Sequence, residues 1–265
     1  MIKKIFLLIV ILFSSYSFGQ KIKNGTSSNE AKVLLKKAVC TDSRGITTTF
    51  YNYIGNKIVS ITNDRKDKNM FFTYTGDLIT KIETKFPDSE KTNFNTILEY
   101  DNKNRLKSAK RLFLHRNEGE LSEYTYKLDG SIIETEYTGD LKIQKIKSED
   151  TNIYYLKNKE IVKNEVGQFR SNVNSYSFDD KNSPHKNILG FDKIKIILPT
   201  FEGVEHNCLN YESSYGGEII TLKSKITYNS DNYPSIREIT KKVSYRGASD
   251  SKIPEKFFNS IEFFY

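Results

Sequence analysis

Apolar and polar side chains alternate one by one along most of this chain. In residues 78–86, Leu78 and Ile82 fall on one face of an extended segment, while Ile79 and Lys81 begin an opposite face that continues with charged residues. A period of two residues is typical of β-strands, whereas a helix repeats its apolar positions every three or four residues. The pattern therefore predicts strands with one buried face and one face in water.

A short unit that begins with a tyrosine recurs along the sequence. Each copy has a tyrosine in an extended run, then a turn rich in Gly, Asn or Asp, and then a second alternating run. These turn residues tolerate the positive φ angles of tight hairpin turns, so each copy predicts one antiparallel hairpin. The first five tyrosines follow one another at intervals of 21 to 29 residues. The copies begin at Tyr53, Tyr74, Tyr100, Tyr126, Tyr155 and Tyr228.

Residues 33–265 are interpreted as a single all-β domain of consecutive antiparallel hairpins. The hairpins form one large twisted and curved sheet, and the pattern leaves open whether that sheet stays open or rolls into a barrel. Val33–Cys40 is interpreted as the first strand, although its spacing also fits a helix. Ser260–Tyr265 is predicted to be a terminal strand that closes or edges the sheet. The regular pattern fails near residues 173–205, which predicts an irregular insertion.

Several of these units resemble YD-repeat (Rhs-like) sequences. Tyr74–Asp77, Tyr100-Asp101 and Tyr228–Asp231 carry the resemblance. The chain is also similar to a group of uncharacterised secreted bacterial proteins with degenerate YD-type hairpins, through Phe178–Pro184 and Tyr228–Pro234. The resemblance covers most of residues 33–245 and implies an extended sheet of hairpins, but no activity. Large YD-repeat proteins enclose toxin domains, and this chain is far too short for that role.

The N-terminus has the features of a secretory signal peptide. Lys3 and Lys4 precede the apolar run Ile5–Phe13, and Ser17 and Gly19 are small residues before a cleavage point at Gln20. The apolar run is too short for a transmembrane helix, which needs about 20 residues. We therefore expect residues 1–19 to be a signal peptide and residues 20–32 to be a flexible segment. An uncleaved anchor is the alternative. No transmembrane segment is expected after signal removal, which predicts a periplasmic, cell-surface or secreted protein.

Charge and cysteine content add two expectations. The net charge of +8 is spread along the chain, which favours a solvated surface over a nucleic-acid partner. Cys40 and Cys208 form an even pair in an exported protein, which suggests a disulfide. Two separately buried thiols are the alternative.

No catalytic, metal-binding or cofactor-binding motif stands out in the sequence. The three histidines are scattered, and the adjacent acids Asp179-Asp180 are typical of a solvated turn. Long irregular segments in compact domains often carry function, so the insertion is the first place to look for a binding region. The candidate residues are Phe178, Asp179, Asp180, Pro184 and His185.

The repeat architecture without a catalytic set favours an exported, non-enzymatic binding or scaffold protein. Its partner would be an envelope protein or a glycan, and no cofactor is expected. One alternative is a hydrolase of envelope polymers that uses acids and His185 of the insertion. Another is a carrier that holds an apolar ligand inside the curved sheet.

Overall fold

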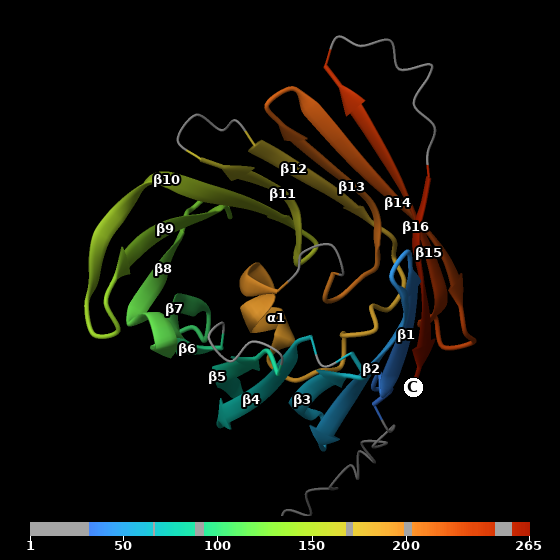
Figure 1. The fold of residues 1–265 in the computed structure, drawn as a ribbon, viewed down its shortest axis with the longest axis horizontal. Coiled ribbons are helices and arrows are strands. Elements are labelled where there is room, and N and C mark those ends of the chain that lie inside the picture. Colours follow the sequence, from blue (N-terminus) through green and yellow to red (C-terminus); the bar gives the residue numbers. More distant parts are fainter. Residues whose placement is uncertain (1–31, 66, 88–92, 168–171, 199–202, 247–255) are drawn as a thin grey trace, which may run out of the picture. The chain divides into compact units, whose positions relative to one another are not determined.

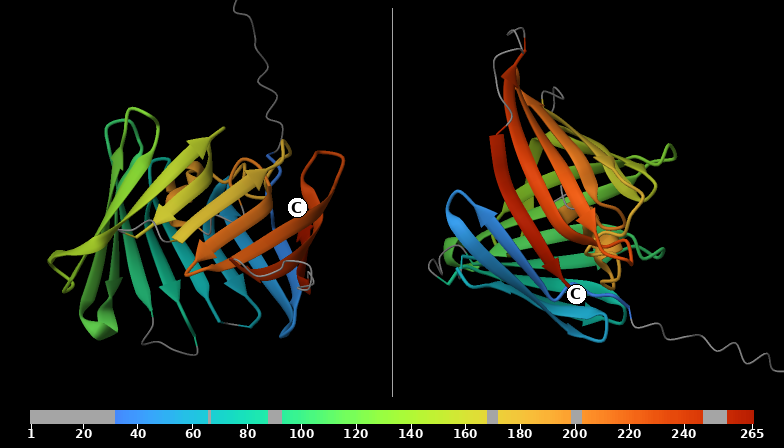
Figure 2. Two further views of the ribbon diagram at one scale, coloured as in Figure 1. Left: turned by 90° about the horizontal axis from the view of Figure 1, so that it is seen from above. Right: turned by 90° about the vertical axis from the view of Figure 1, so that its right-hand side faces the viewer.

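The computed structural model describes residues 32–265, apart from position 66 and the segments 88–92, 168–171, 199–202 and 247–255. The expected signal peptide and all but the last residue of the expected flexible segment lie outside these residues. The described residues form sixteen strands that close into an antiparallel barrel. Figure 1 shows the strands as a ring around a short helix, and Figure 2 shows them crossing the wall obliquely. The expected all-β antiparallel architecture is confirmed, and the sheet is a closed barrel.

The strands are β1 (Lys37–Asp42), β2 (Gly45–Ile54), β3 (Lys57–Asn63), β4 (Asn69–Thr75), β5 (Leu78–Lys85), β6 (Phe94–Tyr100), β7 (Leu106–Phe113), β8 (Glu118–Tyr126), β9 (Ile132–Gly139), β10 (Gln144–Lys157), β11 (Glu160–Val166), β12 (Asn172–Phe178), β13 (Cys208–Tyr215), β14 (Glu218–Tyr228), β15 (Pro234–Tyr245) and β16 (Lys256–Phe264).

The barrel closes where the last strand pairs with the first. Strand β16 lies antiparallel to β1, with Cys40 opposite Ile261, so the predicted terminal strand closes the sheet. The first strand begins at Lys37, four residues later than the sequence suggested.

All six tyrosine units form hairpins, and the tyrosines of the first four face the interior, whereas Tyr155 lies on the outer face beside Lys163 and Glu165. Tyr53, Tyr74, Tyr100 and Tyr126 pack against the buried core from inside the wall. The hydroxyl of Tyr53 donates to the carbonyl of Leu35 at 2.8 Å, and that of Tyr126 donates to the carbonyl of Leu106 at 3.0 Å. Leu35 lies just before β1, and Leu106 is the first residue of β7. Each bond therefore reaches the main chain near the start of an earlier strand. The tyrosines therefore link successive hairpins.

The expected Cys40–Cys208 disulfide is not supported, because both residues are thiols that lie on distant strands. Strands β16, β15 and β14 separate β1 from β13 in the sheet. Four steps of about 4.8 Å between strands far exceed the roughly 7 Å limit between the Cα atoms of a disulfide. Cys208 is fully buried, and burial raises the pKa of its thiol to about 12.

Candidate ligand-binding chamber

The connection between β12 and β13 enters the barrel and forms a plug. This plug, defined here as residues 179–198 and 203–207, contains the helix α1 (Phe191–Ile194) and the 3-10 turn η3 (Lys195–Ile197). Figure 1 shows α1 inside the ring of strands. Phe191 and Ile194 are 2% and 0% exposed, and the ring of Phe191 lies 5.9 Å from that of Phe72 on β4. The insertion expected near residues 173–205 therefore packs into the core, and its first residues belong to β12.

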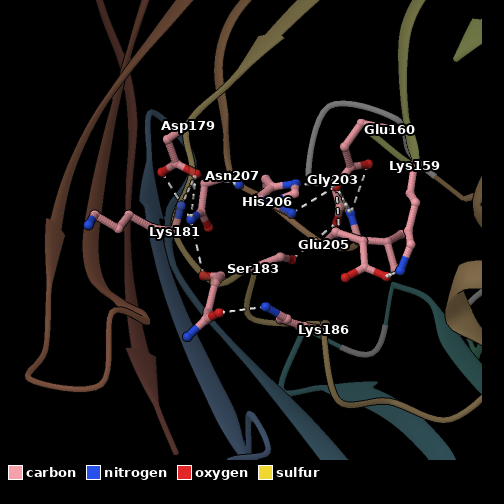
Figure 3. Close-up of polar contacts among 12 residues, drawn as sticks. Lys159, Glu160, Asp179, Lys181, Ser183, Lys186, Gly203, Glu205, His206 and Asn207 are labelled. Carbon is pink, nitrogen blue, oxygen red and sulfur yellow. Dashed lines mark hydrogen bonds and ion pairs between the residues drawn. The ribbon is translucent and has the colours of Figure 1, made fainter. Parts of the chain in front are cut away.

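A buried carboxylate at the start of β11 holds one end of the plug. Glu160 accepts hydrogen bonds from the main-chain N–H groups of Val204 at 3.1 Å, Glu205 at 2.6 Å and His206 at 2.8 Å. Figure 3 shows these bonds converging on the carboxylate, which is 3% exposed. Hydrogen bonds to a buried charge are strong, and three of them offset the loss of water around it. Glu160 therefore fixes the plug to the wall.

A second carboxylate, Asp179, orders the base of the plug. It accepts a bond from the Asn207 main-chain N–H at 3.0 Å and another from the Lys181 N–H at 3.0 Å. The side-chain amide of Asn207 and the hydroxyl of Tyr228 also donate to it. The neighbouring Asp180 side chain is 88% exposed. Asp179 is thus occupied by structural contacts, and the two acids do not converge on a common site.

The other three candidate residues of the insertion also lie in different environments and do not form one site. Phe178 is half-buried at the end of β12, opposite Cys208, and Pro184 is buried. His185 is 7% exposed, and its ring lies 6.1 Å from that of Tyr51 and 5.9 Å from that of Phe191. Of the five residues singled out from the sequence, His185 lines a cavity next to the plug.

That cavity, called here the apolar chamber, has a volume of about 450 Å³. It lies between the plug and the inner faces of β2, β3, β4 and β11. Apolar side chains dominate its lining, and its polar side chains are those of Lys68, Glu160, His185 and Lys195. The apolar lining residues are Tyr51, Ile61, Met70, Ile161, Phe191, Ile197, Leu198 and Val204. Ligand sites are commonly apolar cavities of about 300–1,000 Å³ with a few polar groups, so this chamber suits a small molecule.

A second cavity of about 490 Å³, called here the polar chamber, lies along the inner faces of β5 to β10. Glu134 is at its wall and is 6% exposed. Tyr124 donates to Glu134 at 3.0 Å, Tyr154 at 2.6 Å and Asn152 at 2.8 Å. Burial, followed by the charge of Glu134, raises the pKa of both phenols well above the ordinary value. Both tyrosines therefore stay protonated and act as donors.

Two more carboxylates face the polar chamber. Glu120 pairs with Arg111 at 2.9 Å, and Glu136 accepts a longer bond of 3.3 Å from Asn152. Burial and then the charges of Glu134 and Glu120 raise the pKa of Glu136. Three carboxylates thus face the chamber, together with the cations Arg111 and Lys68. The carboxylates Glu120, Glu134 and Glu136 could not be singled out from the sequence, because strands β8 and β9 carry polar side chains on both faces.

The two chambers share part of their lining. Lys68, Met70, Ile197 and Leu198 contact both cavities. An apolar space and a hydrogen-bonding space therefore meet at η3, inside the barrel.

The described part of the chain contains no cluster of three or more His, Cys, Asp or Glu residues positioned for a metal ion. None of its helices has the length and apolar character needed to cross a membrane.

Comparison with known proteins identifies a related fold. No protein-family model matches the sequence, and no curated protein sequence does. A porin-like protein from Bacteroides vulgatus has a similar structure, with a TM-score of 0.50 and 13% identity over 88% of this chain and 99% of that one. A porin-like protein from Bacteroides uniformis aligns with a TM-score of 0.37 and 6% identity over 83% of this chain and 78% of that one. This chain therefore has a barrel fold similar to that of the Bacteroides vulgatus porin-like protein.

Proposed function

We propose that this protein is an exported, non-enzymatic binding protein that holds a small ligand inside a barrel whose outer wall faces water. The observation that carries the proposal is the apolar chamber between plug and wall. Its apolar lining comes from the plug and from the wall, and only a few polar groups contribute to it, as is common for ligand sites. This favours the carrier expected as an alternative from the sequence over a scaffold that uses only its outer surface.

The outer face of the wall supports a location in water. Strand β5 buries Ile79 and Ile82 inside, so its Lys81 and Glu83 point outward, where they form an ion pair of 2.5 Å. Other strands repeat this arrangement with charges in mid-strand. Exposed or half-exposed charged residues on outer faces include Glu99, Glu123, Lys163, Glu212, Lys223, Lys225 and Glu238. A barrel in lipid carries an outward apolar band about 25 Å tall instead.

Several strands are shorter than the about 9–11 residues of a membrane-spanning strand. Strands β1 and β4 have six and seven residues, and β11 and β12 have seven each, whereas β10, β14 and β15 have 14, 11 and 12. The outward charges, and not strand length, therefore carry the proposed location in water. Exposed apolar residues occur on several strands, among them Ile46, Phe50 and Ile54 on β2, Ile146 on β10 and Ile236 on β15. On β2, Thr48 and Asn52 alternate with them on the same outer face.

The plug gives a second reason to favour binding over passage. Buried side chains of the plug join the same apolar core as side chains of strands β3 to β11. A water-filled pore has a polar interior, whereas this barrel holds a packed core beside its chambers.

A fluorescence titration tests the proposal. N-phenylnaphthylamine is an uncharged apolar probe that becomes bright when it leaves water, and we expect saturable binding to the wild-type protein. Met70→Trp puts a larger side chain where the two chambers meet and should abolish binding. Phe71→Trp changes the adjacent outward residue and should leave it unchanged. Equal binding by the two variants, or none by the wild type, would refute the proposal.

A further inference from the structure

The two chambers meet at η3, so one molecule can occupy both. The residues they share are Met70 on the wall, Lys68 beside it, and Ile197 and Leu198 on the plug. On one side of this junction the lining is apolar, with Phe191 and Val204. On the other side it consists largely of groups that form hydrogen bonds. A ligand that fills both spaces has an apolar part and a polar part.

The polar chamber favours a particular kind of polar group. Three carboxylates, Glu120, Glu134 and Glu136, contribute to its lining, and the Arg111 guanidinium is already bound to Glu120 at 2.9 Å. The second cation of the lining is Lys68 at the junction with the apolar chamber, away from Glu136 on β9. A ligand that places negative charge beside Glu136 would meet repulsion there. A ligand that donates N–H or O–H groups would find acceptors.

Glu136 is the acceptor with the greatest remaining capacity. Glu134 already receives bonds from two phenols and an amide, and it is buried. Glu136 accepts one long bond of 3.3 Å from Asn152, and its side chain is exposed in the chamber. A carboxylate can accept about four hydrogen bonds, so donors on a ligand have room at Glu136.

Building on the proposed function, we infer that the ligand is a single-chain amphiphile. Its apolar chain lies in the apolar chamber, against Phe191, Met70 and Val204. Its head lies in the polar chamber and donates hydrogen bonds to Glu136. Hydroxyl-rich heads and ammonium heads share this donor chemistry, and anionic heads lack it.

A displacement series with one chain length tests the inference. N-phenylnaphthylamine is bound first, and dodecyl maltoside, dodecylamine or dodecanoate is then added below its critical micelle concentration. The hydroxyl-rich or the ammonium amphiphile should displace the probe at a concentration at least about tenfold lower than dodecanoate, which corresponds to about 1.4 kcal/mol. The one with the lower displacing concentration identifies the head. Dodecanoate that matches or exceeds both would overturn the inference.

Two variants locate the head within the barrel. Glu136→Gln removes the charge of this side chain from the polar chamber. It should reduce, by several fold, the ratio between the displacing concentration of dodecanoate and that of the preferred amphiphile. Glu123→Gln removes a charge from the outer face of β8 and should leave this ratio unchanged. Identical displacement by the two variants would overturn the inference. Probe binding without head selectivity, or without displacement by any amphiphile, would overturn the inference and leave the proposed function standing, whereas absence of probe binding by the wild type would refute both.

Discussion

The hydroxyl of Tyr100 on β6 donates a 2.6 Å hydrogen bond to the main-chain carbonyl of Ile79 on β5, 21 residues earlier. Tyr126 makes the equivalent bond to Leu106, 20 residues earlier, at 3.0 Å. The spacing of these bonds is close to the length of one hairpin. The repeated tyrosine therefore ties each of these hairpins to the one before it.

Removing one such hydroxyl should destabilise the barrel. In Tyr100→Phe the carbonyl of Ile79 loses its donor inside the wall, and we expect the free energy of unfolding to fall by about 1–2 kcal/mol. Tyr215 is 66% exposed, so Tyr215→Phe is the matched control and should stay within about 0.5 kcal/mol of the wild type. Urea denaturation measures both. Equal stability of the two variants would show that the tyrosine bond does not support the repeat.

The anchor at Glu160 should control how firmly the plug is held. Glu160→Ala leaves the N–H groups of Val204, Glu205 and His206 without their acceptor. With a loss of about 2–3 kcal/mol, hydrogen exchange at these amides should accelerate roughly a hundredfold. Glu212 is exposed on β13, and Glu212→Ala is the control. Unchanged exchange in Glu160→Ala would mean that the plug is held by packing alone.

The polar chamber should leave a signature in the pH dependence of stability. The pKa of Glu136 is raised by burial and by Glu134 and Glu120, so the folded protein favours its neutral form. Its contribution to stability is therefore present below the unfolded pKa and is lost as pH rises through the folded one. Glu136→Gln should be more stable than the wild type at pH 7, and the difference should disappear near pH 4. Thermal unfolding at several pH values measures this, and a constant difference would contradict it.

The charged outer wall predicts the behaviour of the mature protein toward lipid. Residues 20–265 should purify without detergent and stay at the bottom of a flotation gradient with uncharged phosphatidylcholine vesicles. Insertion of a barrel with Lys81 and Glu83 in mid-strand would place charges in hydrocarbon, at a cost of up to about 2–4 kcal/mol per basic residue. Flotation with the vesicles at physiological salt would show that the wall faces lipid.

The sequence predicted the hairpins because their determinants are local. Tyr74 with Gly76-Asp77 specifies a turn by its own residues, and the terminal strand was visible in the aromatic run ending at Tyr265. Simple alternation gave the wrong face for Ile79, because it assigned this residue to the face in water. Ile79 is fully buried, because the register between β4 and β5 shifts beside Tyr74 and brings Ile79 and Ile82 to the same face. Such a shift depends on the partner strand and leaves no mark in one segment.

The candidate site was harder to predict than the fold. The insertion was recognised as special, yet Asp179 serves structure, and the chamber takes most of its lining from the wall. Closure of the barrel brings the plug beside strands that lie more than a hundred residues away, as the bond from Tyr74 to the carbonyl of Leu189 shows. Glu134 and Glu136 became candidates only once the inner face of β9 was known.

The most direct test of ligand binding inside the barrel is the position of a heavy atom on a bound chain. Crystals grown with an alkyl maltoside or alkylamine, whichever head the displacement series selects, can carry bromine at the end of the chain. Anomalous diffraction then locates the bromine. We expect one strong peak in the apolar chamber, beside Phe191 and Val204. Peaks confined to the outer wall, with both chambers empty at saturating ligand, would contradict this expectation.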